Sequence, residues 1–259
     1  MSRFKVLTIF TLASSLQLGC QTLAVGSQEK SIVDSPKVDP VAELHTKLGT
    51  GYMREGQLDL AWQRLNKALL FDPKYSTAHN AMALLYERLE KPNEAETHYK
   101  DALRYNPSDS SARTNYGSFL CRQGRIDDAA VQFDEALSNP LYRSREIPFN
   151  NYGLCLHEHG DLEKAETYLR QALELNPRIA SALIAMSDLS LAKGQKLSAR
   201  AYIERYAAVS KHSPRTLLLG VRIEQALGDL DAAASYAMQL KSNYPDSDET
   251  RQLLDAEDL

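Results

Sequence analysis

Small, large and helix-breaking residues recur along this chain with a period of 34 residues. Residues 42–75 set the pattern, with small residues at Gly49 and Ala61, a large apolar residue at Leu65 and a proline at position 73. The same order returns 34 residues later at Ala83, Ala95, Tyr99 and Pro107. A fixed period of this length predicts a solenoid of helical hairpins, in which small residues let the paired helices approach and proline ends the second helix.

Turn residues between the paired helices fix the number of hairpins. Glycines mark most of these turns, at positions 56, 124, 160, 194 and 228, and Glu90-Lys91-Pro92-Asn93 forms the turn of the second hairpin. The spacing predicts six repeats, at residues 42–75, 76–109, 110–143, 146–179, 180–213 and 214–247. Pro140 and Pro148 are expected to lengthen the loop between the third and fourth repeats. Residues 248–259 begin with acidic residues and are expected to form a C-terminal capping helix or tail.

The N-terminal residues have the pattern of a secretory signal. Arg3 and Lys5 precede an apolar run over residues 6–18, which is too short for a membrane-spanning helix of about 20 residues. Residues 18–20, Leu-Gly-Cys, resemble a bacterial lipobox, in which the cysteine is acylated. The resemblance implies a signal peptide at 1–19, an acylated Cys20 and, since Gln21 is not Asp, the outer membrane. An ordinary cleaved signal with an incidental cysteine is the alternative. The polar residues 20–40 are expected to form a flexible tether.

Composition and charge exclude several classes of partner and chemistry. The chain is 25% charged with a net charge of −4, so it has no basic excess for nucleic acid. His157-Glu158-His159 does not have zinc-protease spacing, and residues two apart on a helix point apart, so no metal site or cofactor is predicted.

Two cysteines fall on the first helices of adjacent repeats. Cys121 precedes its turn glycine by three residues and Cys155 precedes its own by five. The two places are expected to face each other, and in an oxidising compartment a disulfide forms between such cysteines. Two buried thiols that pack as small apolar residues are the alternative.

The repeat pattern resembles the tetratricopeptide repeat over residues 42–247. This resemblance implies an all-α, right-handed superhelical solenoid of about six repeats. Together with the lipobox, residues 51–57, 115–121 and 151–155 resemble the type IV pilus biogenesis/stability lipoproteins, the PilW or PilF family. Members of that family act as pilotins, so the resemblance implies a monomeric, non-catalytic adaptor at the periplasmic face of the outer membrane. Its partner would be the secretin subunit, whose localisation and multimerisation it would assist.

The first helices of stacked repeats line a concave surface, which predicts a groove for a partner. A mixture of apolar, amide and arginine side chains suits a bound peptide. The predicted groove residues are Thr46, Thr50, Met53, Arg54, Asn80, Leu84, Glu87, Arg88, Thr114, Ser118, Arg122, Asn150 and Leu154, followed by His157, Ile184, Asp188 and Leu191. The alternative for each of them is a solvated side chain or one that packs against its neighbours.

Two other functions remain open from the sequence. The first is a general envelope scaffold that serves another outer-membrane or peptidoglycan machine. The second is an enzyme that carries repeats, which is disfavoured because the repeats occupy nearly all of the chain after residue 41.

Overall fold

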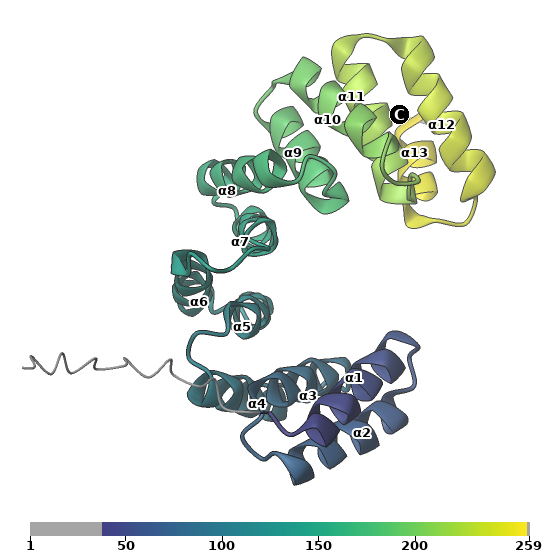
Figure 1. Ribbon diagram of the computed structural model, residues 1–259. Coiled ribbons are helices and arrows are strands. Elements are labelled where there is room, and N and C mark those ends of the chain that lie inside the picture. Colours follow the sequence, from purple (N-terminus) through teal and green to yellow (C-terminus); the bar gives the residue numbers. More distant parts are fainter. Residues whose placement is uncertain (1–37, 258–259) are drawn as a thin grey trace, which may run out of the picture. The chain divides into compact units, whose positions relative to one another are not determined.

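The structure, a computed structural model, describes residues 38–257. These residues form thirteen helices and no strand (Figure 1). The helices are α1 (Pro40–Arg54), α2 (Leu58–Phe71), α3 (Ser76–Arg88), α4 (Pro92–Tyr105), α5 (Ser110–Arg122), α6 (Ile126–Ser138), α7 (Glu146–Glu158), α8 (Leu162–Leu175), α9 (Ala180–Ala192), α10 (Lys196–Ala207), α11 (Pro214–Leu227), α12 (Leu230–Asn243) and α13 (Asp248–Glu257). The predicted signal peptide, Cys20 and most of the predicted tether lie outside the described residues.

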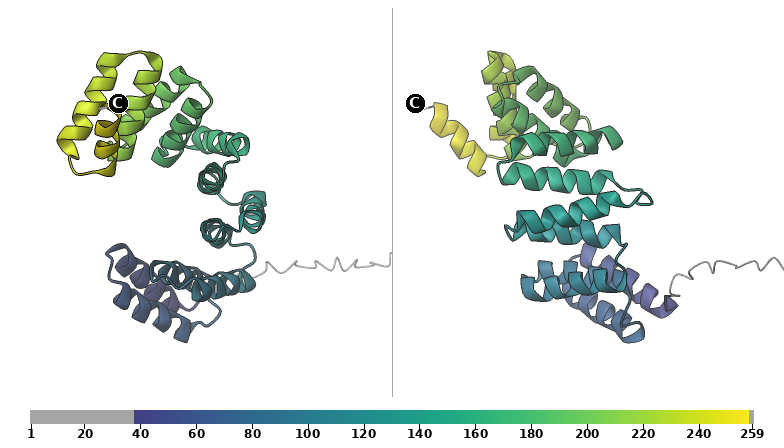
Figure 2. Two further views of the ribbon diagram at one scale, coloured as in Figure 1. Left: turned by 180° about the vertical axis from the view of Figure 1, so that it is seen from behind. Right: turned by 90° about the vertical axis from the view of Figure 1, so that its left-hand side faces the viewer.

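Consecutive helices pair into hairpins, and the hairpins stack in chain order (Figures 1 and 2). Each first helix packs most extensively against its own second helix, and it also contacts helices of the neighbouring hairpins. In Figure 1, α5 and α7 lie on the inner side of the curve, and α6 and α8 lie on its outer side. The predicted all-α solenoid of helical hairpins is confirmed.

The two helices of a hairpin meet where the sequence places small residues. A Cβ atom added to Gly153 would lie 2.7 Å from Cγ of Leu169, so only glycine fits there without a shift. Ser187 occupies the corresponding place in the fifth hairpin, and its hydroxyl donates a hydrogen bond to the carbonyl oxygen of Ala199 at 2.9 Å. The serine is fully buried, and this bond satisfies its polar atom.

The turns between paired helices require left-handed backbone. Gly56 has a φ of 75°, and the glycines that follow α5, α7, α9 and α11 adopt similar values. Glu90 stands at the same place in the second hairpin with a φ of 57°. A side chain in this conformation strains the backbone, so the second turn is built from a less suitable residue than the other five.

Two proline expectations are wrong in position. Pro40 was expected in the tether but is the first residue of α1, where proline is favoured because its missing N–H has no helical partner. The Asp39 carboxylate caps this helix by accepting a hydrogen bond from the Val41 amide at 2.7 Å. Pro148 was expected in the loop after the third repeat but is buried in the first turn of α7. First-turn proline breaks no helical hydrogen bond, so the loop covers only residues 139–145.

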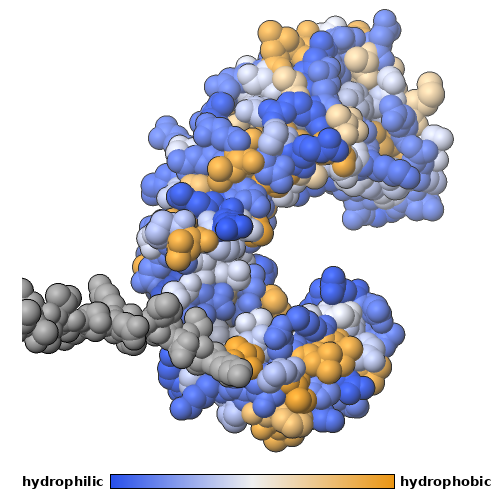
Figure 3. All heavy atoms as spheres, viewed as in Figure 1, coloured by the Kyte–Doolittle hydropathy of each residue, from blue (hydrophilic) through white to orange (hydrophobic). Residues whose placement is uncertain are grey.

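The two ends of the stack differ. At the C-terminal end, Leu253 of α13 packs into a buried cluster with leucines 217, 218 and 240 and with Val221. At the other end, Leu44 and Leu48 of α1 are 54% and 39% exposed. Within residues 38–257, α1 contacts only α2 and α3. Hydrophobic surface is visible in the lower part of Figure 3, where the first hairpins lie.

None of the helices within residues 38–257 has both the length and the apolar character needed to cross a membrane.

Candidate partner-binding site

A hollow of about 330 Å³ opens among three first helices, α3, α5 and α7. It therefore lies on the inner side of the stack, where the sequence predicted a groove. Its lining residues are Leu84, Asn115, Ser118, Cys121, Arg122, Asn151, Leu154, Cys155 and Glu158. Apolar side chains, amides and charges are mixed in this lining, which is the composition of a site that orients a partner through a few polar groups.

Two asparagines at the same place in neighbouring repeats are held by hydrogen bonds between helices. The Nδ2 atom of Asn115 on α5 donates to Oδ1 of Asn80 on α3 at 3.1 Å. The Nδ2 atom of Asn151 on α7 donates to the Ser118 hydroxyl on α5, also at 3.1 Å. Each bond uses one amide proton and leaves the second available. The amides are thus fixed in orientation before a partner arrives.

A disulfide between Cys121 and Cys155 joins α5 to α7 at this hollow. The sulfur atoms are 2.10 Å apart and the Cα atoms 5.9 Å apart, within the ordinary Cα range of a disulfide. Both residues are almost fully buried. The covalent link holds the two helices that carry Asn115 and Asn151 in one arrangement.

His159 lies beside the two cysteines and is a third residue of a kind that can bind a metal. Its Nδ1 lies 4.0 Å from Sγ of Cys121, and the three potential ligand atoms are within 4.8 Å of one another. A metal requires thiolate sulfur, and sulfurs bonded to each other offer none. The Nδ1 atom is instead 2.9 Å from the carbonyl oxygen of Cys155, so it carries the proton of that hydrogen bond. The cluster does not fit a metal while the disulfide is present.

Charges at the rim are partly paired. Arg122 donates to the Glu87 carboxylate across α5 and α3, and Glu87 also accepts the hydroxyl proton of Tyr99. Further along the inner side, Nε2 of His157 is 3.3 Å from the Asp188 carboxylate. This hydrogen bond lowers the pKa of Asp188 below its usual value and outweighs the opposing effect of burial.

The structure separates the predicted groove residues between Thr46 and Leu154 into three groups. Leu84, Ser118, Arg122 and Leu154 come together in the hollow. Five others are buried, namely Thr46, Met53, Asn80, Thr114 and Asn150. The hydroxyls of the two threonines donate to carbonyl oxygens four residues earlier in their own helices. Thr50, Arg54, Glu87 and Arg88 do not line the hollow, and Arg88 donates to the carbonyl oxygen of Met53.

The sequence prediction missed three residues of the hollow, Asn115, Asn151 and Glu158. The groove positions were assigned one residue too early, at Thr114 and Asn150. A signal was present, because the second and fifth repeats carry alanine where the third and fourth carry asparagine. Two amides at a place where the repeats on either side hold alanine indicate a local polar function.

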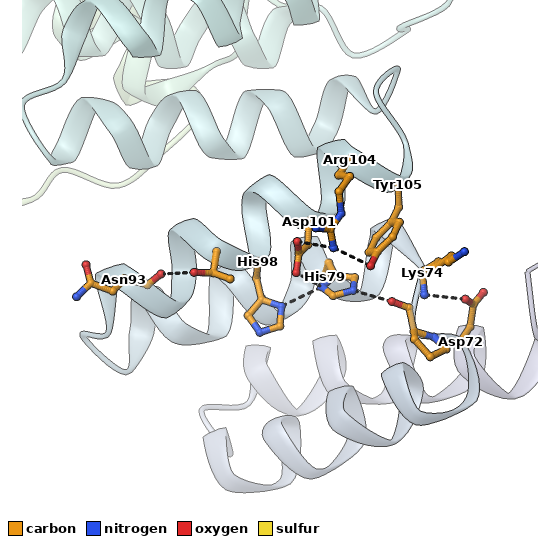
Figure 4. Close-up of polar contacts among 10 residues, drawn as sticks. Asp72, Lys74, His79, Asn93, His98, Asp101, Arg104 and Tyr105 are labelled. Carbon is orange, nitrogen blue, oxygen red and sulfur yellow. Dashed lines mark hydrogen bonds and ion pairs between the residues drawn. The ribbon is translucent and has the colours of Figure 1, made fainter.

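A second polar cluster lies in the second hairpin, away from the hollow (Figure 4). The Nε2 atom of His79 is 3.1 Å from the carbonyl oxygen of Pro73, which can only accept, so Nε2 is protonated. Its Nδ1 is 3.0 Å from Nδ1 of His98, so His98 donates there when His79 is neutral. Burial and the neighbouring His79 lower the pKa of His98. The cluster ties the turn after α2 to α3 and α4, a structural role.

Comparison with known proteins agrees with the helical-hairpin architecture. Residues 80–144, 148–179 and 217–247 match the tetratricopeptide repeat. Stacked hairpins of this repeat define the class, a tetratricopeptide-repeat protein.

Similarity to individual proteins identifies the family within this class. The chain is 34% identical to the type IV pilus assembly protein PilF of Pseudomonas aeruginosa over 239 residues, 92% of this chain and 93% of that protein. Two solved structures, of Pseudomonas aeruginosa PilF and of PilW, a widely conserved type IV pilus biogenesis factor, each superpose with a TM-score of 0.77 at 32% identity. Each match covers 83% of this chain, and 97% and 99% of those chains respectively. The chain belongs to this family of tetratricopeptide-repeat proteins of type IV pilus biogenesis.

Proposed function

We propose that this protein is an outer-membrane lipoprotein that binds the secretin subunit of the type IV pilus and assists its localisation and multimerisation. The family membership supports the pilus setting. The lipobox-like residues 18–20 support acylation at Cys20, with two or more acyl chains needed for a stable anchor.

The observation that carries the binding role is the hollow on the inner side of the stack. It combines fixed amides, two half-buried leucines and a charged rim. Groups of these kinds suit a peptide that is held by its backbone and a few side chains. The protein acts by positioning its partner. The anchor and tether keep the protein at the membrane, and the rigid hollow holds the partner while other subunits arrive. It works as a monomer and without a cofactor.

Deleting the gene and following the secretin on a gel tests the role. The deletion strain is expected to lose heat-resistant secretin multimers and twitching motility. Complementation with the wild-type chain restores both, whereas Cys20→Ala leaves the secretin in the wrong membrane. Unchanged multimers and normal twitching in the deletion strain would refute the proposal.

A pair of asparagine variants ties the role to the hollow. The double variant Asn115→Ala, Asn151→Ala is expected to give few multimers although the protein accumulates normally. Asn93→Ala is the matched control, because Asn93 is exposed at the start of α4 on another surface.

A further inference from the structure

We propose that the partner segment that enters the hollow is extended and carries a lysine or arginine, whose charge pairs with Glu158, beside an apolar side chain that packs between Leu84 and Leu154. This inference rests on the proposed function and names the chemistry of the segment.

The hollow contains one carboxylate without a counter-charge. Glu158 is exposed and lines the hollow. Within residues 38–257, no hydrogen bond or ion pair joins its carboxylate to another residue. Arg122, the cation of the same lining, already pairs with Glu87. The uncompensated charge in the hollow is therefore negative.

The position of Glu158 in its helix increases this imbalance. It is the last residue of α7, where the helix dipole places partial negative charge and favours a cation. The corresponding places at the ends of α1, α3 and α5 hold arginines, Arg54, Arg88 and Arg122. The fourth repeat thus replaces a favourable charge with an unfavourable one, and a bound cation relieves the repulsion.

Neutral groups of the lining define the rest of the segment. Leu84 and Leu154 are half-buried on α3 and α7, so an apolar side chain between them removes surface of both from water. Asn115 and Asn151 each keep an amide proton that is not used between the helices. Asparagines in successive repeats can donate these protons to carbonyl groups of an extended backbone that runs along the inner side of the stack.

An acidic segment fits less well. Its carboxylate would compete with Glu87 for the Arg122 guanidinium and would meet the repulsion of Glu158. Like charges placed together oppose association of the wrong partner.

Opposite effects of two neutralising variants test the inference. The dissociation constant between the purified full chain and the purified secretin subunit is measured by biolayer interferometry at low and moderate salt. Glu158→Gln is expected to weaken binding about threefold to tenfold and to reduce its salt dependence. Arg122→Gln removes a positive charge from the lining and frees the Glu87 carboxylate, so it is expected to tighten binding of a basic segment.

Glu163→Gln is the matched control, because it removes the same charge from an exposed residue of α8 and is expected to change nothing. Circular dichroism verifies that each variant is folded. Weaker binding by Arg122→Gln together with tighter binding by Glu158→Gln would assign an acidic segment instead. Equal affinity of all variants would place the partner elsewhere and leave the proposed function standing. No binding by the wild-type chain would overturn both.

Discussion

A Cβ atom added to Gly49 would lie 2.7 Å from Cγ of Leu65, whereas one added to Gly51, two residues later in the same helix, would meet nothing within 4 Å. Leu65 is fully buried and has little room to move. Gly49→Ala is therefore expected to destabilise the fold by about 1–3 kcal/mol. Gly51→Ala is expected to stabilise it by about 0.5–1 kcal/mol through higher helix propensity. Urea unfolding of both variants checks this, and shifts of the same sign would contradict it.

The left-handed turn at Glu90 has a stabilising substitution. Glycine adopts a φ of 57° without the Cβ strain that a glutamate carries. Glu90→Gly is expected to raise the free energy of unfolding by about 0.5–1 kcal/mol, after allowance for the larger entropy of glycine in the unfolded chain. Gly124→Ala, at the equivalent place in the third hairpin, serves as the reciprocal variant and is expected to be destabilising. Thermal unfolding of both proteins measures the two shifts.

The Cys121–Cys155 disulfide closes a loop of sequence separation 34. Cross-linking a loop of this length limits the unfolded chain and is expected to contribute about 3–4 kcal/mol. Guanidinium unfolding with and without a reducing phosphine should show this difference. The double variant Cys121→Ser, Cys155→Ser should match the reduced protein and be indifferent to reductant. Two thiols that react with an alkylating agent in the oxidised native chain would contradict the pairing.

Glu96 links the second repeat to the third and makes stability depend on acid. Burial alone would raise its pKa, but hydrogen bonds from Lys100, Arg125 and Tyr116 outweigh burial and lower the pKa to about 2. An acid with a lowered pKa stabilises the fold above its ordinary pKa, and this contribution is lost as the pH falls from about 4.5 through about 2.

Glu96→Gln is accordingly expected to cost about 1 kcal/mol at pH 7, since solvent screening reduces the full effect of the shift. The difference between variant and wild type should shrink at pH 2–3. Denaturant unfolding at the two pH values measures it, and a difference that grows on acidification would contradict the linkage.

The periodicity of the sequence was sufficient to predict the architecture. It predicted the residues of the binding site less accurately. The 34-residue spacing predicted the hairpins because small residues and turn glycines are dictated by local helix packing. It assigned the groove to Thr114 and Asn150, whereas their neighbours Asn115 and Asn151 line the hollow. Adjacent residues on a helix differ by about 100° in direction. The twist between stacked hairpins decides which of them faces inward, and a repeat length alone does not contain that twist.

The pairing of charges across repeats was also beyond the sequence. Glu87 and Arg122 are 35 residues apart, and both were predicted to face a partner. In the structure they pair with each other, and Glu158 is the charged residue of the hollow that has no ion pair within residues 38–257. Pro148 shows the same limit at the level of the backbone, because a proline is compatible with a loop and with a first helical turn.

Because the two ends of the stack differ, further hairpins can be added more easily at one end than at the other. A further hairpin fused before α1 would find the leucine face of that helix already exposed for stacking, as Ala78 and Met82 of α3 are already covered in the present array. A hairpin fused after α12 would first have to displace α13 and expose the cluster around Leu253. Engineered versions of this protein can therefore be lengthened on the N-terminal side of α1. They should retain α13 as the C-terminal capping helix.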